Sequence, residues 1–218
     1  DSEDADAEMI AMVIDSLKAA GLKEFQVELG QVAFYRSLLE EAGFCGEVEE
    51  ELNQLVENKN DFGVAELLKG QDIDEGLKQA FLKLPELFGS LEQIAQARKL
   101  TSAPRALAAI ERLEQVHAIL KSYGLADYVS FDLGMLSRYQ YYTGIIFKAY
   151  TYGTGDYIVT GGRYDKLLVQ FGKDTPAVGF AIVVDQVMAA LSRQQIDTPV
   201  TLVNTVILYE ATARDNAI

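Results

Sequence analysis

The chain has 218 residues, of which 49% are hydrophobic and 24% charged, and its formal net charge is -14 at pH 7. This length and hydrophobic content allow a sizeable core, so we expect a globular protein. A strongly acidic surface repels phosphate backbones, which argues against general binding of RNA or DNA. The one cysteine, Cys45, cannot form an internal disulfide, and no apolar run approaches the length of a membrane helix. We therefore expect a cytoplasmic protein without a membrane span.

An amphipathic helix is predicted at the start of the chain. Ser2 or Asp4 can cap it, and its apolar stripe runs up to Gly21. The acidic first turn suits the positive end of the helix dipole, which gives Asp6 and Glu8 their simplest role.

A change of periodicity divides the rest of the chain. Alternating residues over 25–29 predict a strand, and the pattern over 32–42 predicts a helix. From there to about residue 123 no strand pattern occurs, so we expect an all-helical middle part. After Gly124 the apolar period changes to 2, which indicates a sheet.

Short runs of β-branched and aromatic residues predict strands over 128–133, 141–150 and 157–160. A glycine-rich turn between the last two predicts an antiparallel hairpin. We expect Gly161 and Gly162 to turn the chain into a helix that begins near Arg163. Pro176 then precedes another strand and a helix over 184–193. The absence of alternating strands and helices argues against a Rossmann sheet.

Three parts follow from this pattern. We expect a partial sheet-bearing core over 1–30 and 124–193, a helical insertion over 31–123, and the truncated start of a separate α/β domain over 200–218. The third part rests on a strand pattern over 201–210 that follows a polar linker. The sequence starts without methionine or a leader pattern, so we expect it to begin inside a longer chain.

Few residues suggest metal or covalent chemistry. His117 has no cysteine or second histidine near it in the sequence, so we expect no metal site. Cys45 has no catalytic partner in the sequence, and we expect a buried, inert thiol. Arg163 and Asp165 can form an ion pair at the start of a helix.

The tyrosine pair and the glycine pair each allow a structural and a binding interpretation. On a strand, Tyr141 and Tyr142 would point to opposite faces, so only one of them would face a given cavity. Gly161 and Gly162 are typical turn residues, but glycine also permits a small ligand to approach the sheet closely.

Three blocks carry a family resemblance, in this order: Ser137–Phe147, Gly161–Leu168 and Ala177–Ile182. They resemble the second half of a histidyl-tRNA synthetase catalytic domain. The segments Asp6–Ile10 and Glu57–Val64 are similar to other parts of such proteins, so the resemblance covers nearly the whole chain. It implies an α+β class II aminoacyl-tRNA synthetase-like fold, with an antiparallel sheet flanked by helices and an all-helical insertion.

The sequence departs from the synthetase pattern where the family carries catalytic groups. Ser137 and Gln186 stand in place of two arginines that handle the charge of ATP and of the carboxylate, and Gln140 and Val183 also differ. Loss of one preorganised donor costs an enzyme about 2.7 to 4 kcal/mol, so losing two cations argues against aminoacylation. The chain therefore resembles the ATP phosphoribosyltransferase regulatory subunits, which serve histidine biosynthesis. This resemblance implies no catalytic residue and no cofactor.

The resemblance also implies a pocket for free histidine. Its wall would comprise Tyr142, Tyr164, Gly161, Gly162 and Gly179, with Tyr141 and Arg163 as neighbours. Neutral imidazole offers one donor and one acceptor, and a tyrosine hydroxyl can serve either. The implied partner is a short-form ATP phosphoribosyltransferase catalytic subunit, with the full-length protein in a homodimer or a hetero-oligomer. Histidine would then regulate the partner by feedback.

Two alternatives stay open. The first is a histidine-tRNA ligase, or a fragment of one, with divergent motifs; the missing arginines and the acidic surface count against it. The second is an orphan synthetase paralogue that senses an amino acid for another client. The synthetase arginine of the second motif, if present ahead of Asp1, would favour the ligase.

Overall fold

The computed structural model of the chain describes residues 2–136, 141–197, 210 and 212. Ser137, Gln140 and nearly all of the strand expected over 201–210 lie outside the described residues.

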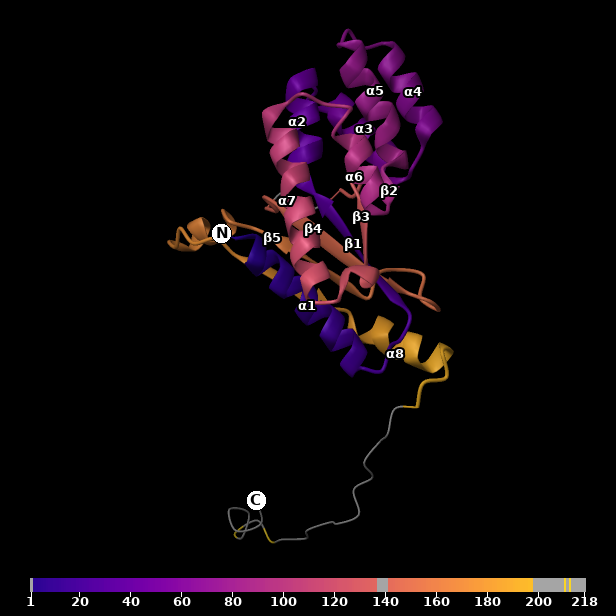
Figure 1. Cartoon of the computed structure of the whole chain (residues 1–218), viewed down its shortest axis with the longest axis vertical. Coiled ribbons are helices and arrows are strands. Elements are labelled where there is room, and N and C mark those ends of the chain that lie inside the picture. The colour runs from indigo at the N-terminus through magenta and orange to yellow at the C-terminus, as the bar shows by residue number, and fades with distance from the viewer. Residues whose placement is uncertain (1, 137–140, 198–209, 211, 213–218) are drawn as a thin grey trace.

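In chain order, most helices of the described part lie between the first strand and the last four strands, all of which appear in Figure 1. The α-helices are α1 (Glu3–Ala19), α2 (Val32–Ala42), α3 (Glu47–Glu57), α4 (Asp61–Lys69), α5 (Glu75–Lys83), α6 (Leu91–Ala97), α7 (Pro104–Ser122) and α8 (Val184–Arg193). Three short 3-10 helices are η1 (Leu84–Glu86), η2 (Ala126–Tyr128) and η3 (Leu167–Phe171). The strands are β1 (Phe25–Gln31), β2 (Phe88–Gly89), β3 (Val129–Asp132), β4 (Ile145–Thr151), β5 (Val159–Arg163) and β6 (Val178–Ile182).

These strands form one sheet in the order β2-β3-β1-β4-β5-β6. Only β1 and β3 pair in parallel, with Val27 opposite Val129, and the other neighbours are antiparallel. Parallel neighbours need a crossover connection. Here the crossover consists of the helices from α2 to α7, with the short β2 among them. The expected α+β class is therefore confirmed.

Helices α1 and α7 lie across one face of the sheet, whereas α3, α4 and α5 gather beyond one end of it (Figure 1). The stripe predicted for α1 packs against that face, and Ile10, Val13 and Ile14 have no exposed surface. Alternate residues of the strands, such as Val27 and Phe147, meet them in the core. Neighbouring positions on a strand point to opposite sides, so the other face carries the charged side chains of Glu28 and Lys148 together with Ile146.

The predicted start of α1 is confirmed in detail. Ser2 is its cap, since the hydroxyl of Ser2 accepts a hydrogen bond of 3.2 Å from the backbone N–H of Ala5. At the other end of the chain, β6 and α8 match the strand and helix expected after Pro176.

Two predictions of local structure are wrong. Phe88 and Gly89 form β2 inside the region expected to be all-helical, and they pair with the end of β3. So short a strand has no alternation to detect. Gly161 and Gly162 do not turn the chain into a helix, because both lie in β5 between β4 and β6. Arg163 ends this strand rather than beginning a helix.

The side-chain environments also differ from two expectations. Cys45 is exposed, not buried. Asp6 is 1% exposed and forms ion pairs across the core, so the helix dipole is not its main partner. His117 packs against the ring of Phe131, with 5.6 Å between ring centroids, as befits a structural histidine.

Candidate functional site

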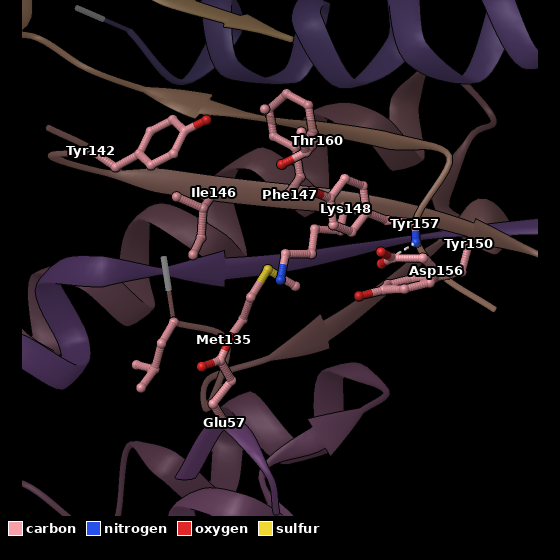
Figure 2. Close-up of a pocket in the computed structure, with 12 residues that line it drawn as sticks. Glu57, Met135, Tyr142, Ile146, Phe147, Lys148, Tyr150, Asp156, Tyr157 and Thr160 are labelled. Atoms are coloured by element: carbon pink, nitrogen blue, oxygen red, sulfur yellow. Dashed lines mark hydrogen bonds between the residues drawn. The ribbon is translucent and has the colours of Figure 1, made fainter. Parts of the chain in front are cut away.

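A cavity of about 360 Å³ opens on the polar face of the sheet, between β4, β5 and the end of α3 (Figure 2). It is lined by Glu57, Met135, Leu136, Tyr142, Ile146, Phe147, Lys148, Tyr150, Asp156, Tyr157, Thr160 and Gly161. A second hollow of about 410 Å³ shares five of these residues and continues toward Glu28, Lys59 and Asp132. The site therefore lies where the helical insertion faces the sheet.

Tyr142, which lines this cavity, belongs to an aromatic cluster of three tyrosines. Ring centroids of Tyr141 and Tyr142 lie 4.6 Å apart, and the ring of Tyr164 lies 6.0 Å and 6.4 Å from them, respectively. The cluster packs on Val32 and Met135. Both tyrosines of the pair precede β4, so the expectation that they point to opposite faces is wrong.

The backbone beside the tyrosine pair is held in place by hydrogen bonds. Arg36 of α2 donates to the carbonyl oxygen of Tyr142 at 2.9 Å. The N–H of Thr143 donates to the carbonyl oxygen of Arg163 at 2.8 Å. The hydroxyl of Thr143 donates to the carboxylate of Asp165 at 3.1 Å and accepts from the N–H of Asp165 at 3.0 Å. Tyr142 is thus fixed by groups from α2 and from the end of β5.

Glycine is required on both faces of β5. A Cβ atom on Gly162 would lie 2.8 Å from the ring of Tyr142, and a Cβ on Gly161 would lie 2.5 Å from the ring of Phe147. On β6, a Cβ on Gly179 would lie 2.9 Å from the hydroxyl of Tyr164. Gly162 and Gly179 pair across the two strands, which brings both under the tyrosine cluster. Gly161 contributes its backbone to the cavity, and its missing side chain faces the core.

Arg163 points away from the cavity into a buried ion-pair network. Its guanidinium lies 2.7 Å from one carboxylate oxygen of Asp6 and 3.0 Å from Asp165. The other oxygen of Asp6 lies 2.8 Å from Arg112 of α7, which also contacts Glu3 at 2.6 Å. The expected ion pair of Arg163 with Asp165 is therefore present. It is part of a larger network that includes Asp6 of α1 and Arg112 of α7. Through Asp165 and Thr143, the network reaches the backbone beside the tyrosine pair.

Charged groups surround the rest of the cavity. Burial, followed by the nearby Asp132 carboxylate, raises the pKa of Glu28 above its ordinary value. Burial also raises the pKa of Tyr150 to about 12, with Glu28 as the next cause. Lys59, in the turn between α3 and α4, donates to both carboxylate oxygens of Asp132 at 2.7 Å. This ion pair joins the helical insertion to the end of β3.

Of the seven expected residues, Tyr142 lines the cavity, and four others pack together beside it, namely Tyr141, Tyr164, Gly162 and Gly179. Gly161 also lines the cavity. Arg163 does not line it, but the carbonyl oxygen of Arg163 accepts the hydrogen bond from Thr143 that holds the backbone beside Tyr142. Sequence reasoning missed Lys148, Met135 and Glu57. Only Lys148 had a usable signal, because alternation from the core residue Phe147 assigns it to the open face.

Other kinds of site have no support among the described residues. Across residues 2–136, 141–197, 210 and 212, no three His, Cys, Asp or Glu side chains are placed to hold a metal ion together. Within the same ranges, none of the helices has the length and apolar character needed to cross a membrane.

A family model described as histidyl-tRNA synthetase matches residues 1–187. The chain belongs to the histidyl-tRNA synthetase family. The match spans the sheet, the helical insertion and the start of α8, so the expected class II synthetase-like fold is confirmed.

Within the histidyl-tRNA synthetase family, the sequence of the chain is similar to those of proteins named ATP phosphoribosyltransferase regulatory subunit. It is 42% identical to the one from Acetivibrio thermocellus over 98% of this chain and 51% of that protein. For the one from Ruminiclostridium cellulolyticum the identity is 43%, over 100% of this chain and 52% of that protein. The predicted resemblance to these subunits is confirmed. The chain spans about half the length of these relatives.

Solved structures agree with this placement in the synthetase family. One from Bacillus halodurans C, described as an ATP phosphoribosyltransferase regulatory subunit/histidyl-tRNA synthetase, has a TM-score of 0.79 at 33% identity and covers 87% of this chain and 50% of that one. A chain of the ATP phosphoribosyl transferase complex from Thermotoga maritima has a TM-score of 0.63 at 21% identity, covering 84% of this chain and 61% of that one. The second likeness shows the fold alone.

Proposed function

We propose that the protein containing this chain is a regulatory subunit of ATP phosphoribosyltransferase, and that its cavity binds free L-histidine. One observation carries the proposal. Tyr142 and Gly161 line a cavity of about 360 Å³, which lies at the small end of the usual range for ligand pockets, and the rings of Tyr141 and Tyr164 pack beside Tyr142. The names of the relatives, at 42% and 43% identity, support the same role.

The tyrosine cluster suits an imidazole. Tyr142 reaches the cavity beside Ile146 and Met135, and its backbone is held by Arg36. An imidazole that stacks among the rings presents its nitrogens to tyrosine hydroxyl groups. A site built to hydrogen-bond these nitrogens rejects amino acids that lack them.

Catalysis in this proposal belongs to the partner, a short-form ATP phosphoribosyltransferase catalytic subunit. Gln186, at the start of α8, supplies no cation where the synthetases carry an arginine. Histidine binding would shift the assembly toward a less active state through a coupling free energy. We expect this assembly in the cytoplasm, and the full-length protein in an oligomer.

Calorimetric titration tests the ligand. We expect L-histidine to bind the intact protein without ATP, and the D-isomer and an imidazole-free analogue to bind far more weakly. Replacing Tyr142→Phe removes one hydroxyl and should weaken binding by about 5- to 150-fold, which corresponds to about 1 to 3 kcal/mol. Tyr123→Phe is the matched control, because Tyr123 is 52% exposed at the end of α7. Absence of L-histidine binding, or an affinity indifferent to Tyr142→Phe, would refute the sensor role.

Co-purification tests the partner. The intact protein should associate with a phosphoribosyltransferase that lacks its own regulatory domain and should make its activity sensitive to histidine. The proposed partner is wrong if the two proteins do not associate and the enzyme alone is already active and inhibited by histidine.

A further inference from the structure

One lysine projects from the sheet into the cavity. Lys148 lies on β4 with Ile146 and Tyr150 on the same face, whereas the intervening Phe147 and Ala149 are buried in the core. Figure 2 shows the Lys148 side chain extending from β4 toward Met135. The position is fixed by the strand, since β4 pairs along its length with β1 and with β5.

Lys148 forms no ion pair or hydrogen bond among the residues that the structure describes, although the Glu28 carboxylate interacts with its charge at longer range. Glu28 lies directly opposite on β1, and Thr160 lies opposite on β5, but neither forms an ion pair or hydrogen bond with it. Its ammonium group lies 5.6 Å from the centroid of the Tyr157 ring. A cation that faces a cavity without a direct ion pair can still bind an anionic group of a ligand.

The charged side chains around Lys148 indicate which charged groups a ligand of this cavity has. Lys148 is the only lysine or arginine among the described residues that line the cavity, and Glu57 and Asp156 are its acidic residues. A compact zwitterion matches this pattern, because its carboxylate needs a cation and its ammonium group needs acidic neighbours. Tyr142 lines the cavity apart from both acidic residues (Figure 2), so an aromatic side chain of the ligand can face it.

We propose that Lys148 binds the α-carboxylate of the amino acid that occupies this cavity. The ammonium group of the ligand then faces Asp156, and its imidazole faces Tyr142. This inference rests on the proposed function and deepens it, because it assigns the recognition of the carboxylate to a residue of β4. It also explains how the site holds an anionic group with Gln186 in place of an arginine.

The test crosses two ligands with three variants of the intact protein. L-Histidine and histamine share the imidazole and the ammonium group, but histamine lacks the carboxylate. Lys148→Gln removes the charge and keeps a polar side chain, Lys148→Arg restores the charge, and Lys121→Gln changes an exposed lysine at the end of α7. Affinities are measured by calorimetry, and folding of each variant is checked by circular dichroism.

We expect Lys148→Gln to weaken L-histidine binding by about 10- to 100-fold, as for loss of a hydrogen bond to a charged group, and to leave histamine binding unchanged. Lys148→Arg should recover most of the affinity, and Lys121→Gln should match the wild type. Equal losses for both ligands would overturn the inference, since Lys148 would then act on the cavity in general. Failure of the wild type to bind L-histidine would overturn the proposed function, and this inference with it.

Discussion

Replacing Asp6→Asn should destabilise the protein severely. The Asp6 carboxylate is 1% exposed and contacts two guanidinium groups, with Arg163 at 2.7 Å and Arg112 at 2.8 Å. Removing one partner of a buried ion pair costs about 3 to 5 kcal/mol, because it leaves a buried charge uncompensated. Arg163 keeps Asp165 and Arg112 keeps Glu3, so we expect the lower end of this range.

The assay is thermal and urea unfolding followed by circular dichroism. A loss of about 3 kcal/mol in the free energy of unfolding corresponds to about 6 to 12 °C in Tm for a chain of this size. Glu8→Gln is the matched control, because Glu8 is an exposed carboxylate on the same helix. The double variant Asp6→Asn with Arg163→Gln should lose less than the sum of the single losses. A loss below about 1 kcal/mol for Asp6→Asn would refute the assignment of a structural ion pair.

Three further predictions concern the cavity and its charges. Gly162→Ala should lower stability by about 1 to 3 kcal/mol and weaken histidine binding, because its Cβ would lie 2.8 Å from the Tyr142 ring; Gly70→Ala, with open space around it, should be tolerated in unfolding and binding assays. Glu28 has a raised pKa, so the folded state binds more protons than the unfolded state and stability falls as the pH rises through that raised value. Glu28→Gln should therefore stabilise the protein at pH 7, with the gain lost toward about pH 4 in urea titrations; a gain independent of pH would contradict this cause. The intact protein should show no histidine-dependent exchange of pyrophosphate into ATP, because Gln186 supplies no cation, and robust exchange would favour the ligase.

Sequence patterns predicted those parts of the fold that depend on local periodicity. The stripe of α1, the alternation of β1 and the helix α8 are each visible in the sequence because one face of the element is buried. The sequence did not predict the ion pairs of Asp6, since its partners Arg112 and Arg163 are distant in the chain.

The candidate site was predicted only as far as the family motifs reach. They named Tyr142 and Gly161, which line the cavity, whereas the glycine pattern placed Gly161 and Gly162 in a turn. Two glycines in a row favour a turn by composition. Here they lie within β5, since rings and backbone from the neighbouring strands leave no room for a Cβ atom. Contacts of this kind are fixed by packing and leave no trace in the order of residues.

The parallel pairing of β1 with β3 has a consequence for how the chain folds. Val27 and Val129 are partners in the sheet, yet about a hundred residues separate them, so closing this loop is entropically costly and slows folding. Helices form from local contacts and do so early. When α2 to α7 are already packed, the ends of the loop lie closer together and the remaining search is shorter. Substitutions in the helical insertion, far from the sheet, should therefore alter the rate at which β1 pairs with β3 and the sheet assembles.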